Sequence, residues 1–114
     1  MSGRITKEMR IRRREDYLIV QSQGKKLHGR HLLAFVRKHD AESCAGRLGL
    51  TVTKRLGNAV VRNRIKRMLR ESMRLRGWVP RGWDVVLVAK ESAARQGHPD
   101  DFDSDLVRVL QQLS

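Results

Sequence analysis

The clearest pattern in the chain is a strict alternation of apolar residues with small or polar ones over 47–53. An apolar side chain at every second position is typical of a strand with one buried face. Leu48, Leu50 and Val52 are therefore expected to face a core. The other face of this strand carries Gly49, Thr51 and Thr53. The pattern predicts a sheet that is buried on one side and offers hydroxyl groups on the other.

A helical period follows this strand and predicts a helix over 59–76. Asn58 suits the N-cap, where its side-chain oxygen accepts a backbone N–H, and Gly77 suits the end of the helix. With about 100° of rotation per residue, five apolar side chains fall on one side of this helix together with Ser72. They are Val61, Ile65, Met68, Leu69 and Met73. The helix is expected to pack against the sheet along this stripe.

Shorter signals complete the order of elements. A helix is predicted over 13–23, closed by Gly24, and candidate strands over 31–37 and 83–90. A last helix is predicted to follow Pro99, with four acids at its start and on its exposed side. These are Asp100, Asp101, Asp103 and Asp105. The order predicts an α+β sandwich, in which three helices cover a small mixed sheet of about four strands.

Length and composition limit the number of domains and the kinds of partner that this fold can have. The 114 residues suit a single domain over 1–114, and 39% hydrophobic residues support a modest core. Lys and Arg number 25 against 12 acidic residues, which gives a formal net charge of +13. Self-repulsion of that size favours a polyanionic partner that neutralises it. Nucleic acid is the first candidate partner, and an anionic membrane is the second.

The positive charge is concentrated in two blocks. Residues 1–38 hold eleven basic residues against three acidic ones, and residues 54–76 hold nine against one. The segment 77–114 is mildly acidic, with four basic and six acidic residues. A directed basic surface is therefore expected, instead of a diffuse basic tail.

The helix in the second block presents a basic face opposite its apolar stripe. Glu71 is the only acid among ten charged residues over 54–76. A merely solvated helix face usually mixes signs, so this one is expected to bind a polyanion. Arginine suits RNA because its planar guanidinium grips phosphate through two hydrogen bonds. The candidate RNA-binding residues are Lys54, Arg55, Asn58, Arg62, Asn63, Arg64, Lys66, Arg67, Arg70 and Arg74.

Other chemistry is not indicated by the sequence. It has no phosphate loop, paired-carboxylate site or nucleophile motif, and its four histidines show no spacing typical of acid–base catalysis. The single Cys44 excludes an internal disulfide, and no Cys/His group has zinc-ligand spacing. The N-terminus lacks the apolar stretch of a signal peptide, and the apolar run 85–89 is too short to span a bilayer. We therefore expect no catalytic residue, metal site, small-molecule substrate or membrane partner, and a cytoplasmic location.

The run over 47–71 resembles the signature of the bacterial ribonuclease P protein. Its core is Arg-Asn-Arg at 62–64, preceded by Gly-Asn-Ala-Val at 57–60 and followed by Lys-Arg. The fixed spacing extends over a strand, a turn and a helix, which argues against chance agreement. Weaker similarity at 12–17 and 84–90 extends the resemblance over nearly the whole chain.

This resemblance implies a function in RNA processing. Members of the family bind the catalytic RNA of ribonuclease P, an endoribonuclease that removes the 5′ leader from precursor tRNA. The RNA and its magnesium ions carry the chemistry, so no cofactor is expected on the protein alone. The protein holds the single-stranded leader in a cleft between the first helix and the sheet. The family fold also implies a left-handed crossover through the motif helix, whereas parallel strands are nearly always joined by a right-handed one.

The same resemblance places a leader cleft on this chain. Tyr17 matches the family's cleft aromatic, and Phe35 lies where another is often found, although ordinary core packing is the alternative for both. Gln21 stands where the family commonly has a second helix aromatic, so its amide could bind a base by hydrogen bonds instead of stacking. The expected cleft residues are Arg13, Tyr17, Gln21, Phe35, Thr51, Thr53 and Lys90.

Two other functions fit the same features. A non-catalytic RNA-binding protein of another assembly, such as the ribosome, would also suit a basic α/β fold. A DNA-binding regulator would place the arginine helix in the major groove. The turn at 57–60 favours ribonuclease P over the ribosomal alternative, and the lack of dimerisation heptads disfavours the regulator. Residues 1–10 are charged without apolar periodicity and are expected to be flexible in the absence of RNA.

Overall fold

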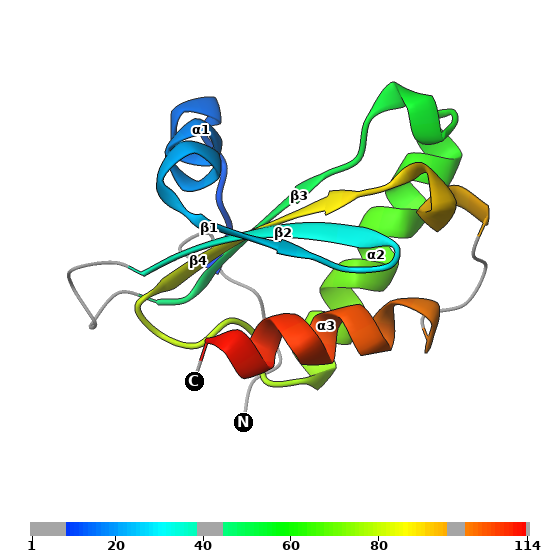
Figure 1. Cartoon of the computed structure of the whole chain (residues 1–114). Coiled ribbons are helices and arrows are strands. Elements are labelled where there is room, and N and C mark those ends of the chain that lie inside the picture. Colours follow the sequence, from blue (N-terminus) through cyan, green and yellow to red (C-terminus); the bar gives the residue numbers. More distant parts are fainter. Residues whose placement is uncertain (1–8, 39–44, 96–99, 114) are drawn as a thin grey trace.

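A mixed four-stranded sheet forms the centre of the molecule (Figure 1). Its strands are β1 (Lys25–His28), β2 (Leu32–Lys38), β3 (Arg47–Thr51) and β4 (Trp83–Ala89). They lie in the order β1-β2-β4-β3, with β1/β2 and β2/β4 antiparallel and β3/β4 parallel. The computed structural model describes residues 9–38, 45–95 and 100–113. The predicted mixed sheet of about four strands is confirmed, while most of the segment 1–10 lies outside the described residues.

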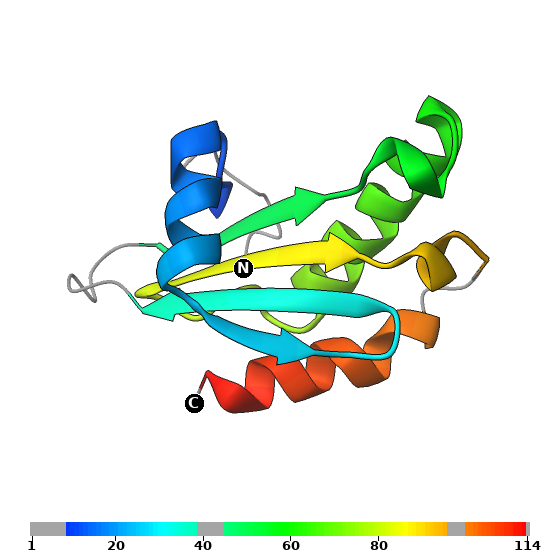
Figure 2. The same ribbon diagram turned by 45° about the horizontal axis from the view of Figure 1, so that its top comes forward.

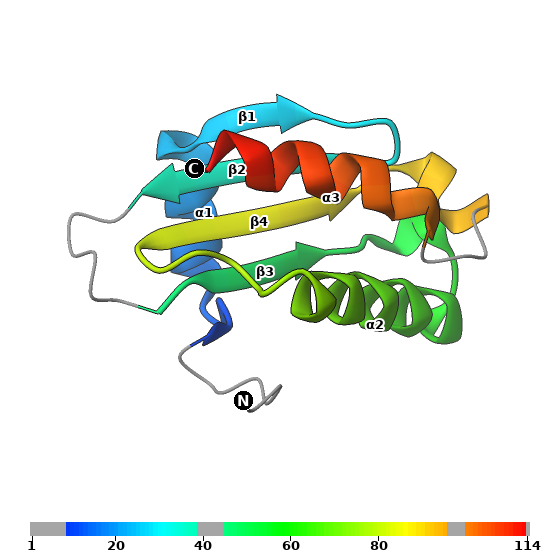
Figure 3. The same cartoon turned by 90° about the horizontal axis from the view of Figure 1, so that it is seen from below.

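Three α-helices in the described part of the chain cover the two faces of the sheet. They are α1 (Arg14–Gln23), α2 (Ala59–Leu75) and α3 (Asp100–Gln112). Figure 2 shows α1 crossing one face at the end where β3 and β4 begin. Helices α2 and α3 lie side by side on the opposite face (Figures 1 and 3). Short 3-10 turns follow β3 at Lys54–Leu56 and β4 at Glu91–Arg95.

The connection from β3 through α2 to β4 is left-handed. Figure 3 views the sheet from the side of α2 and α3, with the parallel strands β3 and β4 pointing the same way. When the strands are turned to point up, β4 lies to the left of β3 and α2 lies in front. This hand is the one that the family resemblance implied and the opposite of the general rule.

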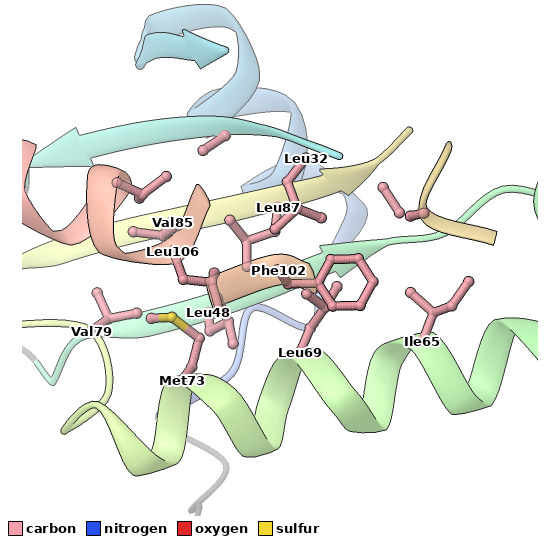
Figure 4. Packing of buried hydrophobic residues seen from close by; sticks show 14 of the residues in the cluster. Leu32, Leu48, Ile65, Leu69, Met73, Val79, Val85, Leu87, Phe102 and Leu106 are labelled. Carbon is pink, nitrogen blue, oxygen red and sulfur yellow. The ribbon is translucent and has the colours of Figure 1, made fainter. Parts of the chain in front are cut away.

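The main core lies between the sheet and the helices α2 and α3. In the apolar stripe of α2, Ile65, Leu69 and Met73 are fully buried, and Val61 and Met68 are partly buried against the same cluster. Fully burying one such side chain contributes roughly 1.5–3 kcal/mol. The stripe meets Leu48, Val85 and Leu87 of the sheet and Phe102 and Leu106 of α3 (Figure 4). The predicted packing stripe is confirmed.

Both ends of α2 agree with the sequence analysis. The Asn58 side chain accepts a hydrogen bond of 3.0 Å from the backbone N–H of Val61, as expected of an N-cap. Gly77 follows the helix with φ of +90°, a left-handed conformation that glycine adopts without steric cost. The N–H of Trp78 donates back to the carbonyl of Met73 at 2.8 Å and so satisfies one of the last helical carbonyls.

Strand β1 and the role of Gly24 differ from the sequence analysis. The segment Lys25–His28 has no apolar alternation, and it is a strand because its backbone pairs with β2. Gly24 has φ of −80°, so it does not close α1 through a left-handed turn. A Cβ at Gly24 would lie 2.4 Å from the carbonyl oxygen of Val20 and 2.8 Å from that of Val36. Close backbone approach, and not turn geometry, therefore requires glycine here.

Asp105 does not lie on the exposed side of the last helix, so that prediction was wrong. Its carboxylate is buried and accepts hydrogen bonds from three successive backbone N–H groups in the turn between β1 and β2. The donors are Arg30 at 2.8 Å, His31 at 2.7 Å and Leu32 at 3.1 Å. A buried carboxylate is tolerated when such donors satisfy it. Asp105 therefore joins α3 to the β1–β2 turn.

Candidate nucleic-acid interface

The basic residues of α2 form two stripes with different exposure. Arg62, Lys66 and Arg70 recur at every fourth position and are half-buried along the border of the apolar stripe. The exposed stripe consists of Asn63, Arg64, Arg67 and Arg74. One buried atom of the first stripe, Nε of Arg62, lacks a hydrogen-bond partner in the described structure. The sequence predicts a single basic face, and in the structure the basic residues of this face differ in burial.

The exposed stripe borders a shallow groove on the outside of α2. The groove encloses about 460 Å³, and Arg64, Arg67, Arg70 and Lys66 line it together with Asn63 and the exposed Val60. No carboxylate from the part of the chain that the structure describes lines this groove. Unbalanced positive charge on an open surface attracts polyanions, and each guanidinium can grip a phosphate through two hydrogen bonds.

Arg74 differs from the other exposed arginines because Glu71 lies one turn before it. Its guanidinium donates two hydrogen bonds to the Glu71 carboxylate, one from Nε at 3.3 Å and a shorter one from Nη2. This hydrogen bond and the attraction of the guanidinium lower the pKa of Glu71. Arg74 is therefore partly neutralised, which weakens it as a phosphate ligand.

Three predicted residues precede the basic stripes. Lys54 and Arg55 are exposed in the 3-10 turn that joins β3 to α2. Asn58 is also exposed, and its side-chain oxygen is engaged in the helix cap. They lie at the N-terminal end of α2, so the predicted RNA-binding residues form one run over the turn and the helix.

A second hollow lies at the outer edge of β3, between α2 and the segment before α1. It encloses about 270 Å³, and its lining includes Arg10, Arg12, Tyr17, Lys66 and Arg70. Figure 3 shows the dark-blue segment before α1 beside β3. A parallel bridge between Arg10 and Leu48 and a 3.0 Å hydrogen bond from Ile11 N–H to the Leu48 carbonyl hold this segment in place. The cavity thus joins the half-buried stripe of α2 to Tyr17.

Tyr17 is held on β3 by two contacts. Its hydroxyl oxygen accepts a hydrogen bond of 3.2 Å from the backbone N–H of Leu50. Its ring lies so close to Gly49 that a Cβ there would stand 2.7 Å from the ring carbon Cε1. The missing side chain of Gly49 therefore leaves room for the Tyr17 ring to pack against β3. The alternation over 47–53 predicts only that Gly49 lies on the polar face of the strand.

Two of the predicted cleft residues, Phe35 and Thr51, lie on the face of the sheet that α1 covers in part. Phe35 is half-buried in a small cluster with Val20 and Val86, and the ammonium of Lys26 lies 5.9 Å from its ring centroid. Strand register places His28, Leu33, Val88 and Thr51 in one row beside this cluster. Thr51 therefore shares the face of Phe35.

The other predicted cleft positions differ in their surroundings. Arg13 is exposed just before α1, and Gln21 is half-buried one turn after Tyr17 on the same helix. Thr53 is exposed beyond the end of β3, so it does not belong to the sheet floor. The Lys90 ammonium donates a hydrogen bond of 2.7 Å to the carbonyl of Gly29 and so lies at the β1–β2 turn.

Three contributors were missed by the sequence analysis. Arg10 belongs only to a predicted basic block and Arg12 also to the segment 12–17 that resembles the family, but nothing in their local pattern shows that they lie near α2. Lys26 stands in a strand that lacks the apolar alternation used to find strands, so its contact with Phe35 had no local signal. In each case the contact joins segments far apart in the sequence.

Two further properties of the described residues bear on function. No group of three or more His, Cys, Asp or Glu residues among them is placed to hold a metal ion. No helix among them is long and apolar enough to cross a membrane.

Comparison with known proteins agrees with the motif. Residues 5–114 match the family model of ribonuclease P. The ribonuclease P protein component of Desulfovibrio desulfuricans is 40% identical over 110 residues, which cover 96% of this chain and 80% of that protein. The component from Thermotoga maritima is 31% identical over 114 residues, which cover 99% of this chain and 96% of that protein.

Solved structures show the same fold. The RNase P protein from Thermotoga maritima aligns with a TM-score of 0.78 at 28% identity and covers 92% of this chain and 97% of its own. The RNase P protein of Staphylococcus aureus aligns with a TM-score of 0.74 at 27% identity and covers 92% and 94%. Family model, relatives and fold agree over nearly the whole length, and this chain belongs to the ribonuclease P protein family.

Proposed function

We propose that this chain is the protein subunit of ribonuclease P and that it binds the catalytic RNA and the 5′ leader of precursor tRNA. The observation that carries the proposal is the basic run on α2, which sits in the family's motif and lacks acids in its groove. In this role it assists the endonucleolytic removal of the leader in the cytoplasm. No observation favours a ribosomal or DNA-binding function.

The two stripes of α2 support a division of contacts. The exposed arginines Arg64 and Arg67 face outward, where a large folded RNA can reach them without steric hindrance. The half-buried Lys66 and Arg70 face the cavity beside Tyr17, on the side of the molecule where α1 meets the sheet. We assign the outward stripe to the catalytic RNA, and the face shared by Tyr17, Phe35 and Thr51 to the leader.

Catalysis is proposed to reside in the RNA and its magnesium ions. The surfaces described here are lined by ammonium and guanidinium groups, which repel a divalent cation and attract phosphate. The protein then contributes by neutralising phosphates, so that catalytic RNA and precursor tRNA approach each other at a lower magnesium concentration.

Cleavage of precursor tRNA by the catalytic RNA at low magnesium tests this function. Addition of the protein should accelerate cleavage at the mature 5′ end, and the gain should shrink as magnesium is raised. A basic peptide with the same net charge serves as the control for general charge neutralisation. Lack of stimulation, or equal stimulation by the peptide, would contradict the proposed function.

A further inference from the structure

The cavity at the outer edge of β3 gathers cations from two separate segments. Arg10 and Arg12 enter it from the segment before α1, and Lys66 and Arg70 enter it from α2. Among the described residues no carboxylate lines the cavity, and none of these four side chains forms an ion pair with any of them. Four like charges around one hollow repel one another, so an anion placed among them would be stabilised.

Tyr17 also lines the cavity, and its hydroxyl has a proton to donate. The oxygen of Tyr17 already accepts the hydrogen bond from Leu50 N–H, and no acceptor for its own proton is found in the described part of the chain. The close packing on Gly49 fixes the position of the ring, so the hydroxyl is oriented before any ligand binds. A preset donor loses little entropy when it binds.

The rest of the lining is apolar and strengthens the attraction. Leu50, Ile11 and the buried Trp78 contribute to the walls. Low-dielectric walls focus the field of the surrounding cations on the space between them. The volume of about 270 Å³ is several times the roughly 30 Å³ that one water molecule occupies in the liquid, so a phosphodiester group fits.

We propose that this cavity binds one phosphodiester group of an RNA strand, with the Tyr17 hydroxyl donating to a phosphate oxygen that Lys66 and Arg70 neutralise. The proposal rests on the proposed function and gives it a specific phosphate site. It assigns Tyr17 a different role from base stacking, because its ring packs against β3 at Gly49 and its hydroxyl keeps a proton to donate in a cavity lined by cations. Arg10 and Arg12 complete the site from the N-terminal side.

Substitutions that keep the ring but change the polar groups distinguish base stacking by Tyr17 from hydrogen bonding by its hydroxyl. Tyr17→Phe retains a stacking surface and removes only the hydroxyl. In the reconstituted holoenzyme it should weaken RNA binding about tenfold, the effect of losing one hydrogen bond to a charged group. The log–log slope of affinity against salt should not change, because no charge is lost. Lys66→Gln should weaken binding and also reduce the slope by about 0.7–0.9.

A shared phosphate also predicts coupling. The combined Tyr17→Phe and Lys66→Gln variant should lose less affinity than the two single losses multiplied together, because both groups act on the same oxygen atoms. Arg108→Gln, on α3 away from this cavity, is the matched control for loss of one cation and should change neither affinity nor coupling. Independent, fully multiplicative losses would overturn the shared site.

Ethylation interference identifies the phosphate and its source. Ethylation neutralises one phosphate at a time, and it is applied in separate arms to the precursor leader and to the catalytic RNA. In the RNA that supplies the phosphate, ethylation at one position should weaken binding of the wild-type protein. Ethylation at the same position should weaken binding of Tyr17→Phe by a smaller factor. Because this comparison is made within each folded protein, altered stability of the variant does not produce it.

The proposal and the proposed function fail in different ways. Wild-type affinity of Tyr17→Phe for both RNAs, or an unchanged interference pattern, would overturn the phosphate site while stimulation of cleavage by the wild-type protein continued. Absence of that stimulation with the wild-type protein would instead overturn the proposed function. In that case the RNA ligand proposed for the cavity would also be ruled out.

Discussion

The Arg47 guanidinium donates two hydrogen bonds of 2.8 Å to the fully buried carboxylate of Asp84. The pair joins the first residue of β3 to its neighbour on β4, and the Nη1 atom of Arg47 also lies 3.6 Å from the Asp16 carboxylate on α1. A single side chain therefore connects both parallel strands to the helix that carries Tyr17. This link fixes α1 across the end of the sheet.

Arg47→Ala should destabilise the fold by about 3 kcal/mol, because it leaves the buried Asp84 carboxylate without its main partner. Asp16→Asn should cost below about 1 kcal/mol, since that contact is longer and partly exposed to solvent. Urea unfolding measures both free energies. Equal costs for the two variants would contradict the dominant role given to Asp84.

Gly49→Ala should displace Tyr17, because the added methyl group would lie 2.7 Å from its ring. The expected cost is about 1–3 kcal/mol of stability, typical of overpacking. Since the chain has one tyrosine, a single fluorotyrosine ¹⁹F NMR signal reports its environment directly. An unshifted signal in the alanine variant would show that the Tyr17 ring does not pack closely on Gly49.

Asp105→Asn should loosen the turn between β1 and β2. One carboxylate oxygen becomes an amide nitrogen that faces backbone N–H groups, so the variant should lose about 2–3 kcal/mol. Hydrogen exchange of the amides of His31 and Leu32 should accelerate more than exchange in the centre of β4. Asp103→Asn, on a half-buried neighbour that pairs with Arg76, is the control and should leave these amides protected. Unchanged protection of His31 and Leu32 in Asp105→Asn would contradict the role of this carboxylate.

Glu71→Gln should tighten RNA binding, although it removes a salt bridge. The substitution releases Arg74 from its carboxylate partner and raises the positive charge of α2 by one. An increase in affinity of about two- to threefold is expected, together with a steeper salt dependence. Filter binding with the catalytic RNA measures both. Weaker binding in Glu71→Gln would show that the pair holds Arg74 in its binding position.

Local patterns were sufficient for most of the elements. The alternation around Leu50 predicted β3, the stripe through Ile65 and Leu69 predicted the packing side of α2, and Asn58 predicted its cap. These features depend on residues within a few positions of one another, so periodicity and capping preferences are enough to predict them. The crossover hand came only from the family resemblance, because no local pattern records how strands are connected in space.

Features that depend on distant contacts could not be read from the sequence. Asp105 looked like an exposed helix residue, but the turn 74 residues earlier supplies donors that draw it inside. Lys26 belongs to a strand that exists through pairing with β2. The division of the basic face likewise depends on where β3 and the segment before α1 lie. Charge and spacing predicted that α2 binds a polyanion, and only the tertiary structure shows that Lys66 and Arg70 line the cavity at β3 as well as the groove on the outside of α2.

Two charge-matched variants test whether the outward face of α2 binds the catalytic RNA through specific contacts. Arg64→Gln with Arg67→Gln removes two cations from this face, and Lys25→Gln with Arg108→Gln removes two exposed cations from β1 and α3. The measurement is the affinity for the catalytic RNA as a function of salt. The first pair should weaken binding at least tenfold and reduce the log–log slope by about 1.5, whereas the second should change both only slightly. Equal losses in the two variants would contradict the claim and leave only the net charge of +13 as the cause of binding.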